Sequence, residues 1–177
     1  MKLHQLLSVS DFERRARALL PRAVFGYVNG GTEDCLTLDA NRAALRAVQF
    51  RPRGLVGVAE RSQVVELWGR GYAHPFGIAP MGVTAMCRHR CEQDLARAAA
   101  AAGIPFVLSG LSTLPMERLR EAAPGFWYQG YIPGDKQIIA PLMQRLAANG
   151  VEVLVVTIDT PLGANRENNQ HNGFTIP

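Results

Sequence analysis

Lysine and cysteine are scarce in this sequence. The net charge of +4 comes from arginine, because Lys2 and Lys136 are the only lysines. The arginines are scattered and form no basic block, which argues against a nucleic-acid-binding surface. The three cysteines, an odd number, favour a reducing cytoplasm over a disulfide framework. Cys87 and Cys91 have no second cysteine pair near them, so we expect no metal site.

Long apolar runs are also missing. The N-terminus has no apolar core of the length that a signal peptide needs. The longest uncharged stretch, residues 98–116, is interrupted by two glycines and two prolines, which argues against a membrane helix. At 47% hydrophobic and 19% charged residues, the composition is that of an ordinary globular protein. We expect a cytoplasmic location.

Four short apolar runs are present, and each ends on a small or polar residue. Such runs are typical of strands buried on both faces, and helical segments between them favour a parallel sheet. We expect strands at 76–80, 104–109, 126–131 and 151–159, and helices at 91–102, 116–122 and 135–149. Pro141 either kinks the last helix or marks a late start.

The first 70 residues carry a different pattern. Ser10 and Glu13 have the spacing of a capping box. Helices are expected at about 10–19, 22–28 and 32–48, the second ending in a left-handed glycine stop, and a short strand is expected at 63–68.

These patterns together predict an α/β fold, a TIM (β/α)8 barrel. A complete barrel needs about 250 residues, so we interpret the sequence as its first four β/α units plus an N-terminal helical segment. We divide it at 1–70, helices and barrel-floor strands, and 71–177, the first half of the barrel. In such barrels the reacting groups lie at the carboxyl ends of the strands. The residues expected there are Pro80, Ser109, Gln129, Tyr131, Thr157 and Asp159.

An ordered set of motifs covers nearly the whole chain: residues 20–27, 30–34, 41–42, 50–53, 78–82, 102–105, 129–131 and 157–167. In order and spacing, this set resembles the FMN-dependent α-hydroxy acid oxidases and dehydrogenases, which include glycolate oxidase, L-lactate dehydrogenase and mandelate dehydrogenase. The resemblance implies an oxidoreductase, a flavoprotein that binds FMN, and an enzyme that converts a small L-2-hydroxy acid into its 2-oxo acid.

The resemblance also assigns the flavin contacts. A flat isoalloxazine needs backbone and small side chains against its face, with donors and acceptors along its pyrimidine edge. Residues that match the family's backbone segment beside the reactive flavin edge are Ala79, Pro80 and Met81. The polar contacts to the ring match Ser109, Gln129 and Thr157. Simple strand-end hydration is the alternative interpretation of the three polar residues.

Four further residues match the family's substrate site. Arg166 matches the arginine that binds the substrate carboxylate in bidentate fashion, and Tyr27 matches the tyrosine that donates to the same group. Tyr27 alone would also suit a helix-face aromatic packed on the barrel. Tyr131 matches the active-site tyrosine near the substrate hydroxyl, and Asp159 matches the aspartate that stabilises the protonated catalytic histidine.

The histidine that acts as general base is expected on a later strand, beyond residue 177. Among the residues present, His4, His74, His89 and His171 match none of the family's base positions. The lysine at the flavin N1–O2 edge, a second substrate arginine and the phosphate-binding loops are expected there too.

Four positions depart from the family's pattern. Leu111 stands where many oxidases have a bulky aromatic, and Gly82 stands where several members have alanine. Both changes are expected to enlarge the substrate pocket and to favour an acid larger than glycolate. Asn169 and Gly173 replace an acidic and a basic residue, which is expected to weaken the loop that carries Arg166.

Two alternatives remain. One is another FMN-binding TIM barrel, such as an isopentenyl-diphosphate isomerase or a nucleotide dehydrogenase, which would not need Tyr27 and Arg166 together. The other is a non-catalytic truncated remnant. The resemblance implies a homo-oligomer when complete, and an electron acceptor that is oxygen, a quinone or a cytochrome. Some relatives carry a membrane-binding insert, so peripheral association with the inner membrane is compatible with a cytoplasmic location.

Overall fold

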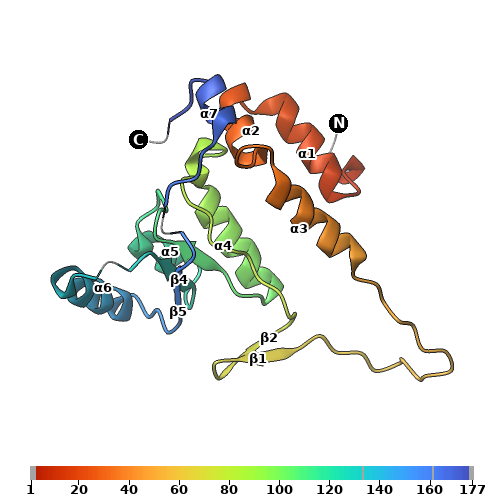
Figure 1. The fold of residues 1–177 in the computed structure, drawn as a ribbon. Helices are drawn as coiled ribbons and strands as arrows, with labels where there is room; N and C mark the ends of the chain where they lie inside the picture. Colours follow the sequence, from red (N-terminus) through yellow and green to blue (C-terminus); the bar gives the residue numbers. More distant parts are fainter. Residues whose placement is uncertain (1–2, 133, 161, 176–177) are drawn as a thin grey trace. The chain divides into compact units, whose positions relative to one another are not determined.

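The computed structural model describes residues 3–132, 134–160 and 162–175 (Figure 1). The chain forms two compact units, one of Met1–Val56 with Leu162–Pro177 and one of Gly57–Pro161. The boundary expected at residue 70 therefore lies inside the second unit. In addition, the C-terminal residues belong with the N-terminal helices rather than with the strands.

The first unit is helical. It contains the 3-10 helix η1 (Leu3–Gln5) and the helices α1 (Val9–Leu19), α2 (Arg22–Asn29), α3 (Leu36–Ala47) and α7 (Glu167–His171). The N-cap of α1 is Ser8, whose side chain accepts from Asp11 N while the Asp11 carboxylate accepts from Ser8 N. The capping box expected at Ser10 is therefore wrong: the same type of motif lies two residues earlier.

Two other helix ends in this unit differ from expectation. Gly30, which caps α2, has φ −83 and is extended, so the expected left-handed stop is wrong. Helix α3 begins four residues later than expected, because Glu33 and Cys35 have φ 47 and 60, outside the helical region. The acidic residues at 33–34 thus belong to the turn before α3.

The second unit opens with a hairpin. Strands β1 (Val65–Leu67) and β2 (Arg70–Tyr72) pair antiparallel, and Trp68 and Gly69 form the turn with φ 48 and 75. Positive φ at both central residues is the requirement of a type I′ hairpin turn. The strand expected at 63–68 is confirmed over β1, whereas β2 was mistaken for a connector.

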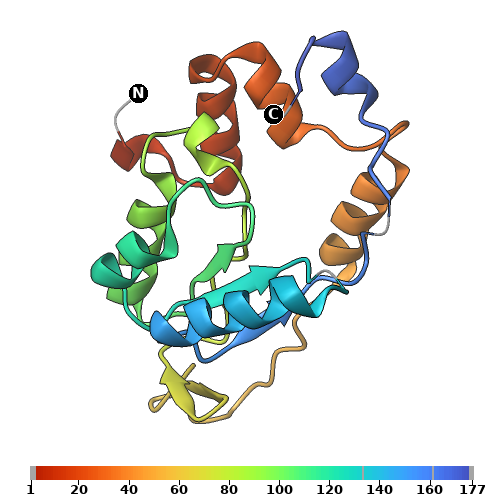
Figure 2. The same cartoon turned by 90° about the vertical axis from the view of Figure 1, so that its left-hand side faces the viewer.

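A parallel three-stranded sheet forms the centre of the second unit. Its order is β3 (Val107–Ser109), β4 (Trp127–Gly130), β5 (Leu154–Val156), and the strand expected at 76–80 is reduced to one parallel bridge between Ile78 and Phe106. The connecting helices are α4 (Cys91–Ala102), α5 (Met116–Ala122) and α6 (Lys136–Ala148), with the 3-10 helix η2 (Thr84–Met86) before α4. Figure 2 shows this strand–helix alternation from a second side.

Helices α4 and α5 have the expected bounds. Helix α6 begins at Lys136 with Asp135 as its N-cap, so Pro141 lies inside it and does not mark a late start. Ala96 and Ala99 of α4 are 0% and 1% exposed and pack in one apolar cluster with Leu108 of β3 and Leu119 of α5. Small side chains on α4 let its backbone approach the sheet closely.

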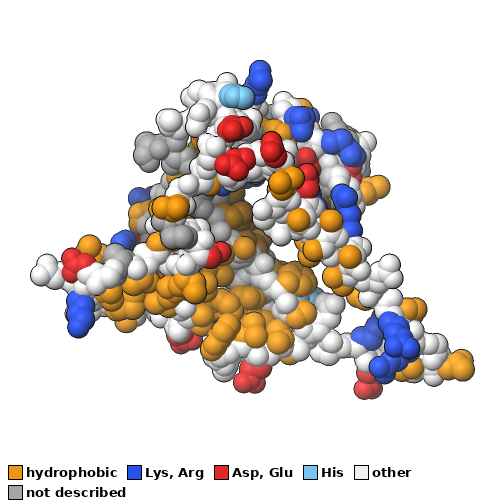
Figure 3. All heavy atoms as spheres, in the orientation of Figure 1, with side chains coloured by type: hydrophobic (Ala, Val, Ile, Leu, Met, Phe, Trp, Pro, Cys, Tyr) orange, Lys and Arg blue, Asp and Glu red, His pale blue; other side chains and the backbone are white. Residues whose placement is uncertain are grey.

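Apolar side chains remain exposed on the face around α6 and β5 (Figure 3). They include Ile138, Leu154, Val156 and Ile158. Strand β5 pairs on one edge with β4, and no other strand within the described ranges pairs with its second edge. The same ranges contain no helix of the length and apolarity needed to cross a membrane.

Candidate active site

Three polar side chains form a hydrogen-bonded row at the carboxyl ends of β3, β4 and β5. The Ser109 hydroxyl donates to Gln129 Oε1 over 3.2 Å, and Gln129 Nε2 donates to Thr157 Oγ1 over 2.8 Å. The parallel register produces this row, because it pairs Ser109 with Gln129 and sets Thr157 directly after the β5 residue opposite Gly130. Ser109 and Gln129 are 6% and 3% exposed.

The row has the chemistry that a flavin edge requires. All three side chains are uncharged, as suits the neutral pyrimidine part of an isoalloxazine. An amide nitrogen has two hydrogens and a hydroxyl has one, so Gln129 and Thr157 each keep a donor beyond the bond between them. The donor set therefore fits FMN.

The segment expected beside the flavin lies next to this row. Ile78 N donates to Pro105 O over 2.9 Å, which places Ala79, Pro80 and Met81 just after the bridge to β3. Ala79 and Met81 are exposed, and Pro80 is half-buried. The backbone and small groups of this segment are thus available to a flat ligand.

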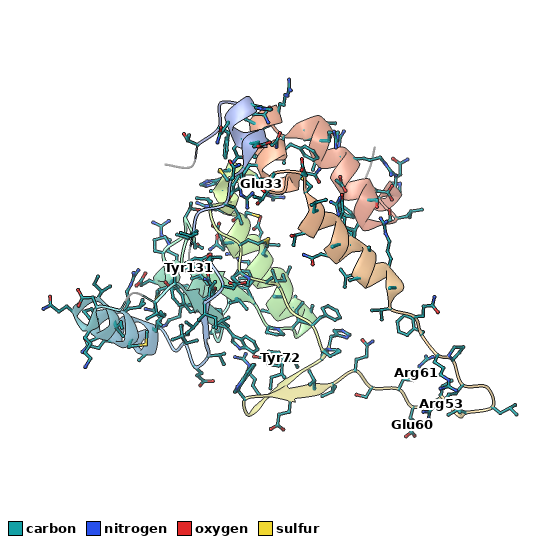
Figure 4. The ribbon with its side chains drawn as sticks, in the orientation of Figure 1. Glu33, Arg53, Glu60, Arg61, Tyr72 and Tyr131 are labelled. Atoms are coloured by element: carbon teal, nitrogen blue, oxygen red, sulfur yellow. The ribbon has the colours of Figure 1, made fainter. Side chains whose placement is uncertain are left out.

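Tyr131 and Asp159 follow the ends of β4 and β5. The strands are still hydrogen-bonded just before these residues, because Thr157 N donates to Gly130 O over 3.1 Å. The Tyr131 side chain is 49% exposed (Figure 4) and that of Asp159 is also exposed. Neither side chain has a hydrogen-bond or ionic partner among the described residues, so both remain open to other groups.

The first unit brings Tyr27 and Arg166 together. The Arg166 guanidinium carbon lies 4.9 Å from the Tyr27 ring centroid, and Arg166 Nη1 donates to Tyr27 O over 3.3 Å. The Tyr27 ring also contacts Phe174, whose ring centroid is 5.2 Å from that of Tyr27. A cation stacked on an aromatic ring is held in place without losing its charge. Within the described ranges no carboxylate pairs with Arg166.

Helix α7 holds Arg166 in this position. Arg166 is its N-cap, and Asn168 Nδ2 donates to Gly26 O of α2 over 2.8 Å. A Cβ at Gly26 would lie 2.9 Å from Asn168 Nδ2, so a larger residue there would require the Asn168 side chain to shift. Gly173 ends the helix with φ 59, a conformation that suits glycine. The sequence interpretation missed α7, which has only five residues.

Among the described residues, His74 is the one histidine whose side chain has a hydrogen bond or ring contact. His74 Nδ1 lies 2.6 Å from Gln63 Oε1, and its ring stacks on Phe76. The described ranges also contain no group of three His, Cys, Asp or Glu side chains arranged to hold a metal.

Sequence reasoning missed a buried acid, Glu92, in the first turn of α4. It is 2% exposed and accepts from the backbone and hydroxyl of Thr113. Burial raises the pKa of this carboxyl, but the hydrogen bonds that it accepts outweigh burial, and the net shift is downward. Glu92 is therefore a carboxylate at neutral pH. No sequence signal separates it from the exposed acids of other helices.

The polar row at the carboxyl ends of a parallel β/α sheet is compatible with the class of flavin-binding β/α barrels. The family model described as FMN-dependent dehydrogenase matches residues 16–177. The chain belongs to this FMN-dependent family.

The chain is also similar in sequence to curated relatives and in structure to solved proteins of this kind. The chain is 37% identical to an L-lactate dehydrogenase of Caulobacter vibrioides over 96% of its own length and 45% of the relative's. It is 35% identical to glycolate oxidase 3 of Oryza sativa over 97% and 47%. An (S)-mandelate dehydrogenase structure matches with a TM-score of 0.90 and 34% identity, covering 97% of this chain and 49% of the other. The chain thus spans about half the length of these proteins and has the fold of half of a TIM barrel.

Proposed function

We propose that this chain supplies the flavin-facing strand ends and the substrate-carboxylate site of an enzyme that oxidises a small L-2-hydroxy acid to its 2-oxo acid with FMN. The observation that carries the proposal is the pair of Tyr27 and Arg166. Its cation is stacked, half-buried and unpaired with any described acid. Relatives named for lactate, glycolate and mandelate all act on acids that present a carboxylate.

In this proposal Arg166 binds the substrate carboxylate. A guanidinium has five N–H donors, and one of them is engaged with Tyr27 O. The remaining donors allow a bidentate contact. The Tyr27 hydroxyl, fixed by Phe174 and by the guanidinium on its ring, donates to the same carboxylate.

The strand-end residues act on the rest of the reaction centre. FMN, when bound, supplies the two-electron acceptor. The row of Ser109, Gln129 and Thr157 orients the ring edge, and the segment 79–81 lies against its face. Tyr131 contacts the substrate hydroxyl. Asp159 stabilises a protonated histidine, which we place outside this sequence.

The pair of Tyr27 and Arg166 favours this function over the two alternatives, another FMN-binding barrel and a non-catalytic remnant. An FMN barrel that acts on a diphosphate or on a nucleotide base has no need for a single stacked arginine with a tyrosine donor. A non-catalytic remnant would have no need for an unpaired, half-buried cation. We further propose a cytoplasmic homo-oligomer, with oxygen, a quinone or a cytochrome as electron acceptor.

The test is anaerobic reduction of the flavin in the gene product that contains this chain. We expect L-lactate, L-2-hydroxyoctanoate or L-mandelate to bleach the flavin, and the D-enantiomers to leave it oxidised. The exposed Leu111 favours the larger acids over glycolate, by about tenfold in catalytic efficiency for one or two extra methylenes. The isolated 177 residues are expected to give no bleaching, because none of the four histidines matches the family's base position. Failure of every L-2-hydroxy acid to reduce the flavin of the gene product would overturn the proposal.

A further inference from the structure

Glu92 joins two elements that are distant in sequence. Its carboxylate oxygen Oε1 accepts from Thr113 Oγ1 at 2.9 Å, from Thr113 N at 3.2 Å and from Ser112 Oγ at 3.4 Å. Helix α4 therefore holds the loop between β3 and α5 through a charge-assisted contact, which is stronger than one between neutral groups.

This loop in turn holds the segment that follows Ile78. Leu111, two residues before Thr113, accepts from Val83 N over 3.0 Å through its carbonyl oxygen. Val83 is a β-branched residue with φ 47, a conformation that persists only when the surroundings enforce it. The hydrogen bond from Val83 N to Leu111 O helps to hold Val83 in this conformation.

Thr84, the next residue, begins η2, and its Oγ1 is buried without a hydrogen bond to a described residue. Among the described residues, the hydrogen bonds that the Glu92 carboxylate accepts come from Ser112 and Thr113 of the loop 110–114. The carboxylate therefore acts on η2 only through this loop and its contact with Val83.

We propose that Glu92 is a positioning residue for the segment 79–83, whose first three residues, 79–81, are those expected beside the flavin. Its buried carboxylate fixes the loop 110–114, and Leu111 of this loop fixes the segment through Val83. The proposal rests on the proposed function for its link to FMN, and on the geometry of the second unit for the mechanical link.

The experiment compares Glu92→Gln with the parent chain by amide hydrogen exchange and by FMN titration followed through flavin fluorescence. Glutamine keeps the size of the side chain and removes the charge. We expect exchange at the amides of Thr113 and Val83 to become about tenfold faster, as the loss of a charged acceptor implies. Exchange at Tyr128, whose amide donates to Val153 O in the sheet, is expected to stay unchanged.

Two controls isolate the role of the carboxylate. Glu121→Gln removes an exposed acid that lines the same 480 Å³ hollow as Glu92, and it should change no exchange rate. Thr113→Val removes one donor to Glu92 and should give a smaller increase at Val83. If Glu92→Gln does not fold, exchange at Val83 in Thr113→Val tests the link between Glu92 and Val83 instead.

Hydrogen exchange tests the mechanical link between Glu92 and Val83, and the FMN titration tests the positioning role of Glu92. Unchanged exchange at Val83 in Glu92→Gln, or an equal increase throughout the unit, overturns the mechanical link. A dissociation constant for FMN that does not rise by about tenfold while Val83 exchange increases overturns the positioning role. If the parent chain binds no FMN, the titration is repeated in the gene product that contains it. Absence of FMN binding there would count against the proposed function and against the role of Glu92 toward FMN, while the exchange arm still decides the mechanical link.

Discussion

A Cβ added to Gly82 would lie 2.9 Å from the Cβ of Leu111. Cβ atoms that are not bonded to each other do not approach so closely in folded proteins, so the two positions depend on each other: a side chain at residue 82 would require Leu111 or the backbone to shift. The missing methyl group would point at Leu111, so the expectation that glycine at 82 leaves more room near the flavin is tied to the residue at 111. The expected preference for an acid larger than glycolate therefore depends on Leu111.

We predict that Gly82→Ala destabilises the second unit by about 1–3 kcal/mol, the usual cost of overpacking. The change in unfolding free energy can be measured by urea denaturation. Leu111→Gly removes the opposing Cβ, so in that background the added alanine should cost much less. Leu111→Ala keeps the Cβ and should give no relief.

Gly71→Ala is the matched control. No atom lies within 4 Å of a Cβ placed there, and Gly71 has no positive φ. Its effect should stay within about 0.5 kcal/mol. Equal costs at 71 and 82 would show that loss of glycine, and not the contact with Leu111, determines the result.

Periodic and capped segments could be predicted from the sequence. Helix α4 has a run of alanines that favours helix and Gly103 in the left-handed conformation at its end, so its bounds were right at both ends. The row of Ser109, Gln129 and Thr157 could also be predicted, because parallel strands bring their carboxyl ends to one edge of a sheet.

Features that depend on tertiary contacts could not be predicted. Glu92 has the sequence context of an exposed first-turn acid, and only the loop 110–114 makes it a buried hydrogen-bond acceptor. Strand β2 is three residues long and is defined by pairing with β1, which local patterns do not reveal. Helix α7 depends in the same way on the contact of Asn168 with α2.

The α1 cap gives a direct test of the corrected boundary. We predict that Ser8→Ala destabilises the first unit by about 1 kcal/mol, because it removes the oxygen that accepts from Asp11 N. Ser10→Ala should be nearly neutral, since Ser10 lies inside the helix. Thermal unfolding of both variants gives the comparison, and a larger loss for Ser10→Ala would restore the original interpretation.

A salt bridge between α5 and α6 predicts a pH dependence. Arg145 Nε and Nη2 donate to the two carboxylate oxygens of Glu117 over 2.7 and 2.9 Å. The hydrogen bond from Arg145 is the main cause that lowers the pKa of Glu117 from 4.5 to about 2. A depressed pKa means that the pair's contribution is complete above about pH 4.5 and is lost as the pH falls through 2.

The variant Glu117→Gln should therefore unfold at a lower temperature than the parent at pH 7, and the difference should shrink between pH 4.5 and 2. Both side chains are about half exposed, so 0.5 M salt should reduce the difference as well. Glu121→Gln is the control, because Glu121 is exposed and pairs with no side chain in the part of the chain that the structure describes. A difference between Glu117→Gln and the parent that does not depend on pH would contradict the assignment.

The stacked pair of Tyr27 and Arg166 gives the prediction closest to the chemistry. In the gene product that contains this chain, Arg166→Met should lower kcat/KM for the 2-hydroxy acid by a factor equivalent to about 3 kcal/mol, because a charge-assisted contact to the carboxylate is lost. Tyr27→Phe keeps the ring under the guanidinium and removes one neutral donor, so its cost should be about 1 kcal/mol. Arg15→Met on α1 removes an exposed arginine that has no partner among the described residues, and it should leave kcat/KM unchanged. Thermal unfolding of all three variants separates a binding role from a structural one, since Arg166 also donates to Tyr27 O. Unchanged efficiency in a folded Arg166→Met variant would remove Arg166 from the carboxylate site.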